Sequence, residues 1–102
     1  MSETKEQAVR AAFQGYLRGE QPQEVELVRA PKLDVWEAAV RTKDGAKTLV
    51  LKGEVAGHPS YRDGERVTTS PVIWLDRQCR WARTIGRLYK LEGRVIDEDI
   101  EL

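Results

Sequence analysis

The sequence has little of what metal and disulfide chemistry requires. It contains one cysteine, Cys79, and one histidine, His58, among 102 residues. A lone cysteine cannot form an intrachain disulfide, and a zinc site needs several cysteine or histidine ligands, so we expect neither. Asp63, Glu65 and Asp76 could bind magnesium, but carboxylates at such positions more commonly form turns. The sequence therefore predicts no metal and no cofactor.

Two further absences narrow the class of protein. No apolar run approaches the roughly 20 residues that are needed to cross a bilayer. No glycine-rich phosphate-binding motif occurs. Residues 2–6 are polar and charged and do not resemble a signal peptide. Together with the single cysteine, these features predict one domain, residues 1–102, in a reducing cytoplasm and without a membrane partner.

The charges are balanced overall but unevenly distributed. Lys and Arg number 17, and so do Asp and Glu. Residues 58–91 carry seven basic and three acidic side chains (7 − 3 = +4), whereas residues 92–102 carry one and five (1 − 5 = −4). Six of the seven central cations are arginine, which makes bidentate contacts with carboxylates and phosphates. This region is either a solvated basic face or a binding surface.

The N-terminal third predicts one helix and one short element. Residues 4–18 fit a helix because apolar residues recur at helical spacing and Gly19 follows as a stop. The apolar stripe consists of Ala8, Val9, Ala12, Phe13, Tyr16 and Leu17. Residues 24–29 fit either a short strand or a helical turn, and Pro31 prevents a helix from continuing.

A β-hairpin follows, and its register can be inferred. Residues 35–41 and 48–55 flank Asp44-Gly45, a strong signal for a two-residue turn. With this turn at the tip, residues whose numbers sum to 89 face each other. The pairs include Val40 with Leu49, Ala38 with Leu51, Trp36 with Gly53 and Glu37 with Lys52. One face is then apolar and the other carries an opposite-charge pair, and a one-residue slip would destroy both features.

The remaining strands are less regular. Residues 66–75 read as a strand in which Pro71 indicates a sheet edge or a bulge. Residues 81–91 read as the returning strand, and a tip at Arg77-Gln78 pairs Trp74 with Trp81. Residues 92–102 form an acidic tail or a last edge strand. The predicted fold is α+β: an N-terminal helix, then a curved antiparallel sheet of four to five strands over residues 34–91, either open or rolled into a small open barrel.

The candidate binding residues lie on these later strands and turns. They are Arg77, Arg80, Arg83, Arg87, Tyr89, His58, Thr69 and Ser70. Hydroxyls on a sheet can simply pair with each other, or they can join arginines and an aromatic ring in holding a phosphate or a base. The three tryptophans, at positions 36, 74 and 81, more commonly belong to a core, whereas an exposed one would suit a protein interface.

The sequence gives little support for an enzymatic function. His58 could act as a general base near Ser60, Ser70 or Thr69, but a serine–histidine pair also needs a third group to orient it and a site for the oxyanion. Neither can be identified, and a histidine that precedes a proline is more simply a constrained loop residue. The arginines around Cys79 could lower its thiol pKa, but a single thiol indicates no activity. We expect no enzyme.

The chain resembles a family of small proteins, a domain of unknown function, from alphaproteobacteria and their phages. The resemblance rests on Leu27-Val28-Arg29-Ala30-Pro31-Lys32-Leu33, Trp36, Gly53-Glu54-Val55-Ala56-Gly57-His58-Pro59, Asp63-Gly64, Thr69-Ser70, Leu75-Asp76, Trp81-Ala82-Arg83-Thr84 and Arg87-Leu88-Tyr89-Lys90-Leu91. Gly86 stands where the resemblance leads us to expect a serine. The resemblance implies no activity, but it implies a setting of phage or mobile DNA, where small proteins often inhibit host defence.

Two functions therefore stand as hypotheses. The first is a non-enzymatic binding protein, a phage or mobile-element accessory that inhibits a host protein complex in the manner of an anti-CRISPR protein. The second is a nucleic-acid or nucleotide binder that uses the arginine-rich strands. The zero net charge and the isoelectric point of about 6.6 count against the second. The sequence leaves the partner and the oligomeric state open.

Overall fold

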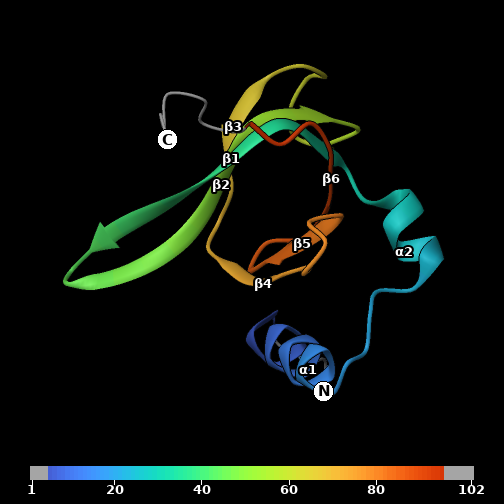
Figure 1. Ribbon diagram of the computed structural model, residues 1–102, viewed down its shortest axis with the longest axis vertical. Helices are drawn as coiled ribbons and strands as arrows, with labels where there is room; N and C mark the ends of the chain where they lie inside the picture. The colour runs from blue at the N-terminus through green and yellow to red at the C-terminus, as the bar shows by residue number, and fades with distance from the viewer. Residues whose placement is uncertain (1–4, 96–102) are drawn as a thin grey trace, which may run out of the picture.

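A strongly curved six-stranded sheet carries two helices on its outer side (Figure 1). The computed structural model describes residues 5–95. The elements are α1 (Lys5–Leu17), α2 (Glu24–Arg29), β1 (Lys32–Lys43), β2 (Ala46–Ala56), β3 (Arg66–Thr68), β4 (Val72–Leu75), β5 (Trp81–Thr84) and β6 (Leu88–Leu91). The strand order is β3-β2-β1-β6-β5-β4. The predicted α+β class and N-terminal helix are confirmed, whereas the strand number was underestimated.

The sheet separates two apolar clusters. Its concave side encloses the larger one, which consists of Leu33, Trp36, Leu51, Val55, Ala82, Tyr89 and Leu91. On the outer side, Tyr16 of α1 packs with Trp81 and Leu88, and Leu27 and Ala30 of the α2 region cover the same face. The strands produce both clusters because successive side chains point to opposite faces. Ala82 thus faces the inner cluster while its neighbour Trp81 faces α1.

Both helices end for local reasons. At the end of α1, Gly19 adopts a φ of 94°, and its N–H donates to the Tyr16 carbonyl over 3.0 Å. Residues 24–29 form a helix, which resolves the alternative that the sequence left open. Ala30 is extended, as expected for a residue that precedes proline. No helix within residues 5–95 is long and apolar enough to span a membrane.

The β1–β2 hairpin has the predicted register from Glu37 to the turn. Glu37 pairs with Lys52 and Val40 with Leu49, and Asp44-Gly45 is the two-residue tip. Both tip residues have positive φ, as this turn requires. The predicted apolar face is present, but it is not covered along its whole length, because Val40 is 66% exposed. The alternating pattern specified the pairing but not what packs against it.

A bulge divides this hairpin into two parts. The register shifts between Asp34 and Glu37, where Val35 adopts a φ of 48°. Opposite the bulge, a Cβ placed on Gly53 would lie 2.8 Å from the Asp34 carbonyl and 3.0 Å from the Trp36 Cβ, so only glycine fits. Both strands contribute to the core before the bulge, and β2 also does so beyond it through Val50 and Leu51, which pair with Ala39 and Ala38. Residues 37–49, which we call the arm, lead into the ribbon that projects away from the sheet (Figure 1).

The strand predicted over residues 66–75 is two strands. They are β3 and β4, which lie at opposite edges of the sheet, so the chain crosses from one edge to the other between them. Thr69 fixes this crossing, because its N–H donates to the Leu51 carbonyl and its Oγ1 accepts from the Leu51 N–H. Pro71 indicated a sheet edge correctly. The edge strand β4 approaches β2 but does not pair with it, so the sheet is not closed.

The β4–β5 register and the all-antiparallel sheet were predicted wrongly. Trp74 pairs with Arg83, and not with Trp81, because the turn is longer than Arg77-Gln78. The strand predicted over residues 81–91 is also two strands, separated by a turn in which the Thr84 N–H donates to the Arg87 carbonyl. The second of them, β6, runs parallel to β1, so the sheet is mixed.

The alternative of an acidic tail or a last edge strand lies largely outside the described residues. Within them, the Glu92 N–H donates to the Leu33 carbonyl and the Val95 N–H donates to the Trp36 carbonyl. The chain therefore follows β1 as far as Trp36. Residues 96–102 are not described.

Candidate functional site

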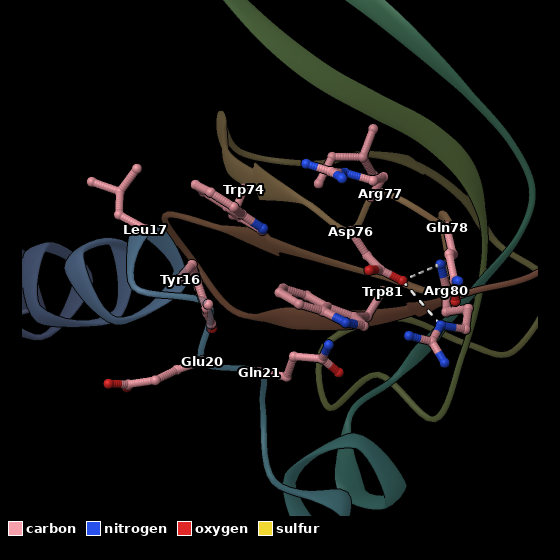
Figure 2. Close-up of a pocket in the computed structure, with 12 residues that line it drawn as sticks. Tyr16, Leu17, Glu20, Gln21, Trp74, Asp76, Arg77, Gln78, Arg80 and Trp81 are labelled. Atoms are coloured by element: carbon pink, nitrogen blue, oxygen red, sulfur yellow. Dashed lines mark hydrogen bonds and ion pairs between the residues drawn. The ribbon is translucent and has the colours of Figure 1, made fainter.

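An open groove lies between the C-terminal end of α1 and the turn that joins β4 to β5 (Figure 2). Its volume is about 620 Å³. The lining residues are Tyr16, Leu17, Gly19, Glu20, Gln21, Trp74, Leu75, Asp76, Arg77, Gln78, Arg80 and Trp81. The groove thus combines aromatic rings, two arginines, the carboxylates of Glu20 and Asp76, and amide side chains from elements that are far apart in the sequence.

Three aromatic rings form one wall of this groove. The Tyr16 ring centroid lies 5.1 Å from that of Trp81 and 5.8 Å from that of Trp74. Figure 2 shows the three side chains coming from α1, β4 and β5. Strand alternation places both tryptophans on the outer face, and the helical spacing of the α1 stripe places Tyr16 over them. Burial raises the pKa of the Tyr16 hydroxyl, while the nearby charge of Arg83 opposes this effect.

The indole N–H of Trp81 is buried without a hydrogen-bond partner among the described residues. The residue is 2% exposed. In Figure 2 its nitrogen lies on the side of the ring toward Gln21 and Arg80. These three residues also line a smaller adjoining hollow of about 340 Å³. An unsatisfied buried donor costs about 1–3 kcal/mol, so a movement of the covering side chains that let an acceptor reach this N–H would be favoured.

The turn beside this indole is built around Asp76. Its buried carboxylate accepts hydrogen bonds from the Arg80 backbone N–H over 3.0 Å and from Arg80 Nε over 3.2 Å. The Cys79 N–H donates to the Asp76 carbonyl, and Cys79 adopts a φ of 58°. These contacts hold Arg80 at the groove with its side chain 61% exposed. Arg77 is exposed and makes no ion pair with a described residue.

Arg83 and Arg87 line a second hollow, and Arg83 also lies close to Tyr16 of the groove. This hollow has a volume of about 350 Å³ and is also lined by Glu26 and Arg29. The Nε of Arg83 is buried and lacks a hydrogen-bond partner among the described residues. The predicted arginine surface is therefore two surfaces, one at the β4–β5 turn and one between β5, β6 and α2.

His58 and Tyr89 belong to a third group. The His58 ring lies 4.7 Å from the Tyr61 ring and 6.1 Å from the Tyr89 ring, centroid to centroid. Its Nδ1 accepts the Ser60 backbone N–H over 3.0 Å. Burial, with a smaller effect from Arg87, lowers the pKa of His58, and burial raises that of Tyr89. A neutral imidazole that bonds its own loop fits the constrained loop residue that the sequence indicated.

The two predicted hydroxyl residues hold the sheet together. Thr69 is buried and bonds to Leu51, as described above. Ser70 Oγ accepts the Gly86 N–H over 2.9 Å. A Cβ added at Gly86 would lie 3.1 Å from this oxygen, so a residue with a side chain would have to displace it. Within residues 5–95, no three His, Cys, Asp or Glu side chains lie close enough to hold a metal ion.

Comparison with known protein families gives one result. Residues 7–102 match the family of unknown function DUF6634. The chain belongs to this family. The resemblance to a domain of unknown function is thereby confirmed, and the family description names no activity. Searches of the curated proteins and of the solved structures found no match.

The sequence identified part of the groove. Arg77 and Arg80 were candidates, and the structure brings them together, whereas the other six candidates lie elsewhere or hold the fold. The reasoning missed Tyr16 and Gln21, and it considered Trp81 without singling out its indole N–H. Tyr16 could have been suspected from the helical stripe, but nothing in the sequence indicates where α1 packs on the sheet.

Proposed function

We propose that this protein is a small non-enzymatic binding protein that captures a segment of a protein partner in the groove at the β4–β5 turn. One observation carries the proposal, which is the buried and unpartnered indole N–H of Trp81 beside an open groove. A peptide carbonyl or carboxylate oxygen is the acceptor that this donor lacks. The adjoining rings of Tyr16 and Trp74 offer apolar contact to the same segment.

The two arginines favour an acidic segment. Arg77 is exposed at the groove, and Arg80 is held beside it by Asp76. Guanidinium groups bind carboxylates through paired hydrogen bonds. Tryptophan, tyrosine and arginine are also the residues that most often dominate binding energy at protein interfaces. A segment with one acidic and one apolar side chain fits these groups best.

The proposal extends to a biological setting. The protein is an accessory of phage or mobile-element type in the bacterial cytoplasm, and it inhibits a host protein complex in the manner of an anti-CRISPR protein. Support for this setting comes from the small size and from the resemblance given above. The groove supports the binding step, because it offers recognition groups and not a paired nucleophile and base.

A second candidate function uses the other arginine surface. Arg83 and Arg87 line one hollow, and the unpartnered Nε of Arg83 could bind a phosphate oxygen of a nucleic acid. Glu26 in the same hollow opposes a phosphate electrostatically. Binding of this kind weakens strongly between about 50 and 200 mM salt, because neutralised phosphates release counterions.

Affinity capture from a lysate of the source organism, treated with nuclease and read by mass spectrometry, tests the two functions. The whole protein is compared with Arg77→Glu in the groove, Arg87→Glu on the second surface and Arg62→Glu as a matched exposed control. We expect a protein that is captured by the wild type and by Arg62→Glu but lost with Arg77→Glu. Loss with Arg87→Glu alone, or capture that disappears with nuclease, would contradict the groove as the binding site.

A further inference from the structure

Most side chains of the arm are exposed, and the exposed ones lie on both of its faces. Val40 is two-thirds exposed on one face, and Glu37, Arg41 and Lys43 are exposed on the other. A two-stranded ribbon is only marginally stable in water unless something packs against it. The arm nevertheless continues the hairpin in regular register as far as the Lys43–Ala46 pair (Figure 1). Such a ribbon is a surface that gains stability from a partner.

One edge of the arm is open and unoccupied by the described chain. β1 pairs with β6 only at Lys32 and Leu33. The Val95 N–H then reaches the Trp36 carbonyl, so within residues 5–95 the open edge begins at Glu37. In a hairpin with a two-residue turn, the residues that flank the turn, here Lys43 and Ala46, form a hydrogen-bonded pair. Hydrogen-bonded and non-hydrogen-bonded pairs then alternate along the two strands, and residues of the second kind direct their backbone groups outward. Ala38, Val40 and Thr42 therefore direct their N–H and C=O groups to the open edge.

We infer that this edge pairs antiparallel with the same edge of a second copy of the chain, about a two-fold axis at Val40. The open segment, residues 37–43, has Val40 as its midpoint. The cross-copy pairs are Val40 with Val40, Ala38 with Thr42, Ala39 with Arg41 and Glu37 with Lys43 of the second copy. The axis repeats the Glu37–Lys43 pair, so each dimer contains two opposite-charge pairs and one central valine pair.

Neighbouring registers fit less well. An axis at Arg41 would place the two Arg41 side chains opposite each other, and like charges in that position repel. An axis at Ala39 would need the Trp36 backbone, whose carbonyl already accepts the Val95 N–H. The other edge of the arm carries Lys47 and has no acidic residue between positions 46 and 50 to complement it. Charge complementarity therefore favours the β1 edge over the β2 edge and disfavours the Arg41 axis. The Ala39 axis would also pair Glu37 with Arg41, and it is the occupied Trp36 carbonyl that favours the Val40 axis over it.

The molar mass of the whole protein in solution tests this inference. We expect light scattering after gel filtration to report twice the 11.6 kDa of one chain at high concentration, with a shift toward 11.6 kDa on dilution. Val40→Pro removes an outward N–H from the proposed interface and should leave a monomer. Leu49→Pro changes the residue directly opposite on the other edge of the same ribbon and should still dimerise. Thermal unfolding monitored by circular dichroism checks that both variants fold.

Charge exchange tests the register, with thermal unfolding of each variant as a check because Glu37 also pairs with Arg66 of its own chain. Glu37→Lys and Lys43→Glu should each raise the dimer dissociation constant about tenfold, because each creates two like-charge pairs. The double variant should restore dimerisation toward the wild-type value. A wild type that is monomeric throughout would overturn the inference, as would single variants without effect. A monomer whose arm binds duplex DNA in a mobility-shift assay would also overturn it and assign the arm to nucleic acid.

Discussion

The two antiparallel hairpins of this sheet differ in what their sequences specify. In β1–β2 the register could be predicted from the sequence, but the apolar face of the arm is exposed. In β4–β5 the predicted register was wrong, yet the arginines of its turn do line the groove. Turn chemistry and alternation determine how two strands pair. What packs against them, and hence what they do, is determined by distant elements such as α1.

The base of the first hairpin should be the most sensitive part of the molecule. Trp36 is 1% exposed and belongs to the inner cluster. We expect Trp36→Ala to lower the free energy of unfolding by about 3–5 kcal/mol, because it leaves a large cavity. Val40→Ala on the arm should change it by less than about 0.5 kcal/mol. Urea unfolding at low protein concentration gives the free energy of unfolding of each variant. Equal decreases for the two variants would contradict the difference in packing between the base of the hairpin and the arm.

A substitution in the turn of the second hairpin should lower the free energy of unfolding by an intermediate amount. Asp76→Ala removes the acceptor for the Arg80 N–H and Nε, and the backbone donor is partly buried. We expect a loss of about 1–3 kcal/mol in the free energy of unfolding, measured with urea. Asp76→Asn keeps an acceptor oxygen and should cost less than the alanine variant. An alanine variant as stable as the wild type would show that this carboxylate does not hold the turn.

The smallest expected effect is the contribution of His58 to the pH dependence of the free energy of unfolding. Its pKa is lowered in the folded chain, chiefly by burial and then by Arg87, so the unfolded chain takes up the proton first as pH falls. Stability should therefore decline as pH drops below the ordinary histidine value of 6.5 and level off below the folded pKa. His58→Gln should lack this decline. Unfolding free energies measured between about pH 5 and 8 give the comparison, and parallel curves for both proteins would contradict the lowered pKa.

Local signals explain how much of the fold was predictable. Asp44-Gly45, the stripe of α1 and Pro71 each act over a few residues, and the turn, the helix and the sheet edge that they indicated are present. The β4–β5 register depended on a side chain, since the Asp76 carboxylate stabilises a longer turn in which Cys79 has positive φ. The parallel pairing of β6 with β1 joins residues almost 60 positions apart, which no local pattern encodes.

Of the candidate site, only the charged residues Arg77 and Arg80 could be predicted from the sequence. Arg77 and Arg80 follow from the arginine excess of residues 58–91 and from their place in a turn. The indole of Trp81 becomes a binding group only because α1 and the turn bury it without supplying an acceptor. Its role thus arises from packing between elements, and a single sequence carries no sign of it.

Site-specific photocrosslinking in cells of the source organism tests the groove most directly. A benzophenone amino acid replaces Gln78, which is exposed and lines the groove, or Arg62, which is exposed elsewhere as a control. We expect irradiation to give a nuclease-resistant adduct with another protein from position 78 and none from position 62. An adduct from position 62 alone, or a nuclease-sensitive adduct from position 78, would contradict the proposal that this groove binds a protein.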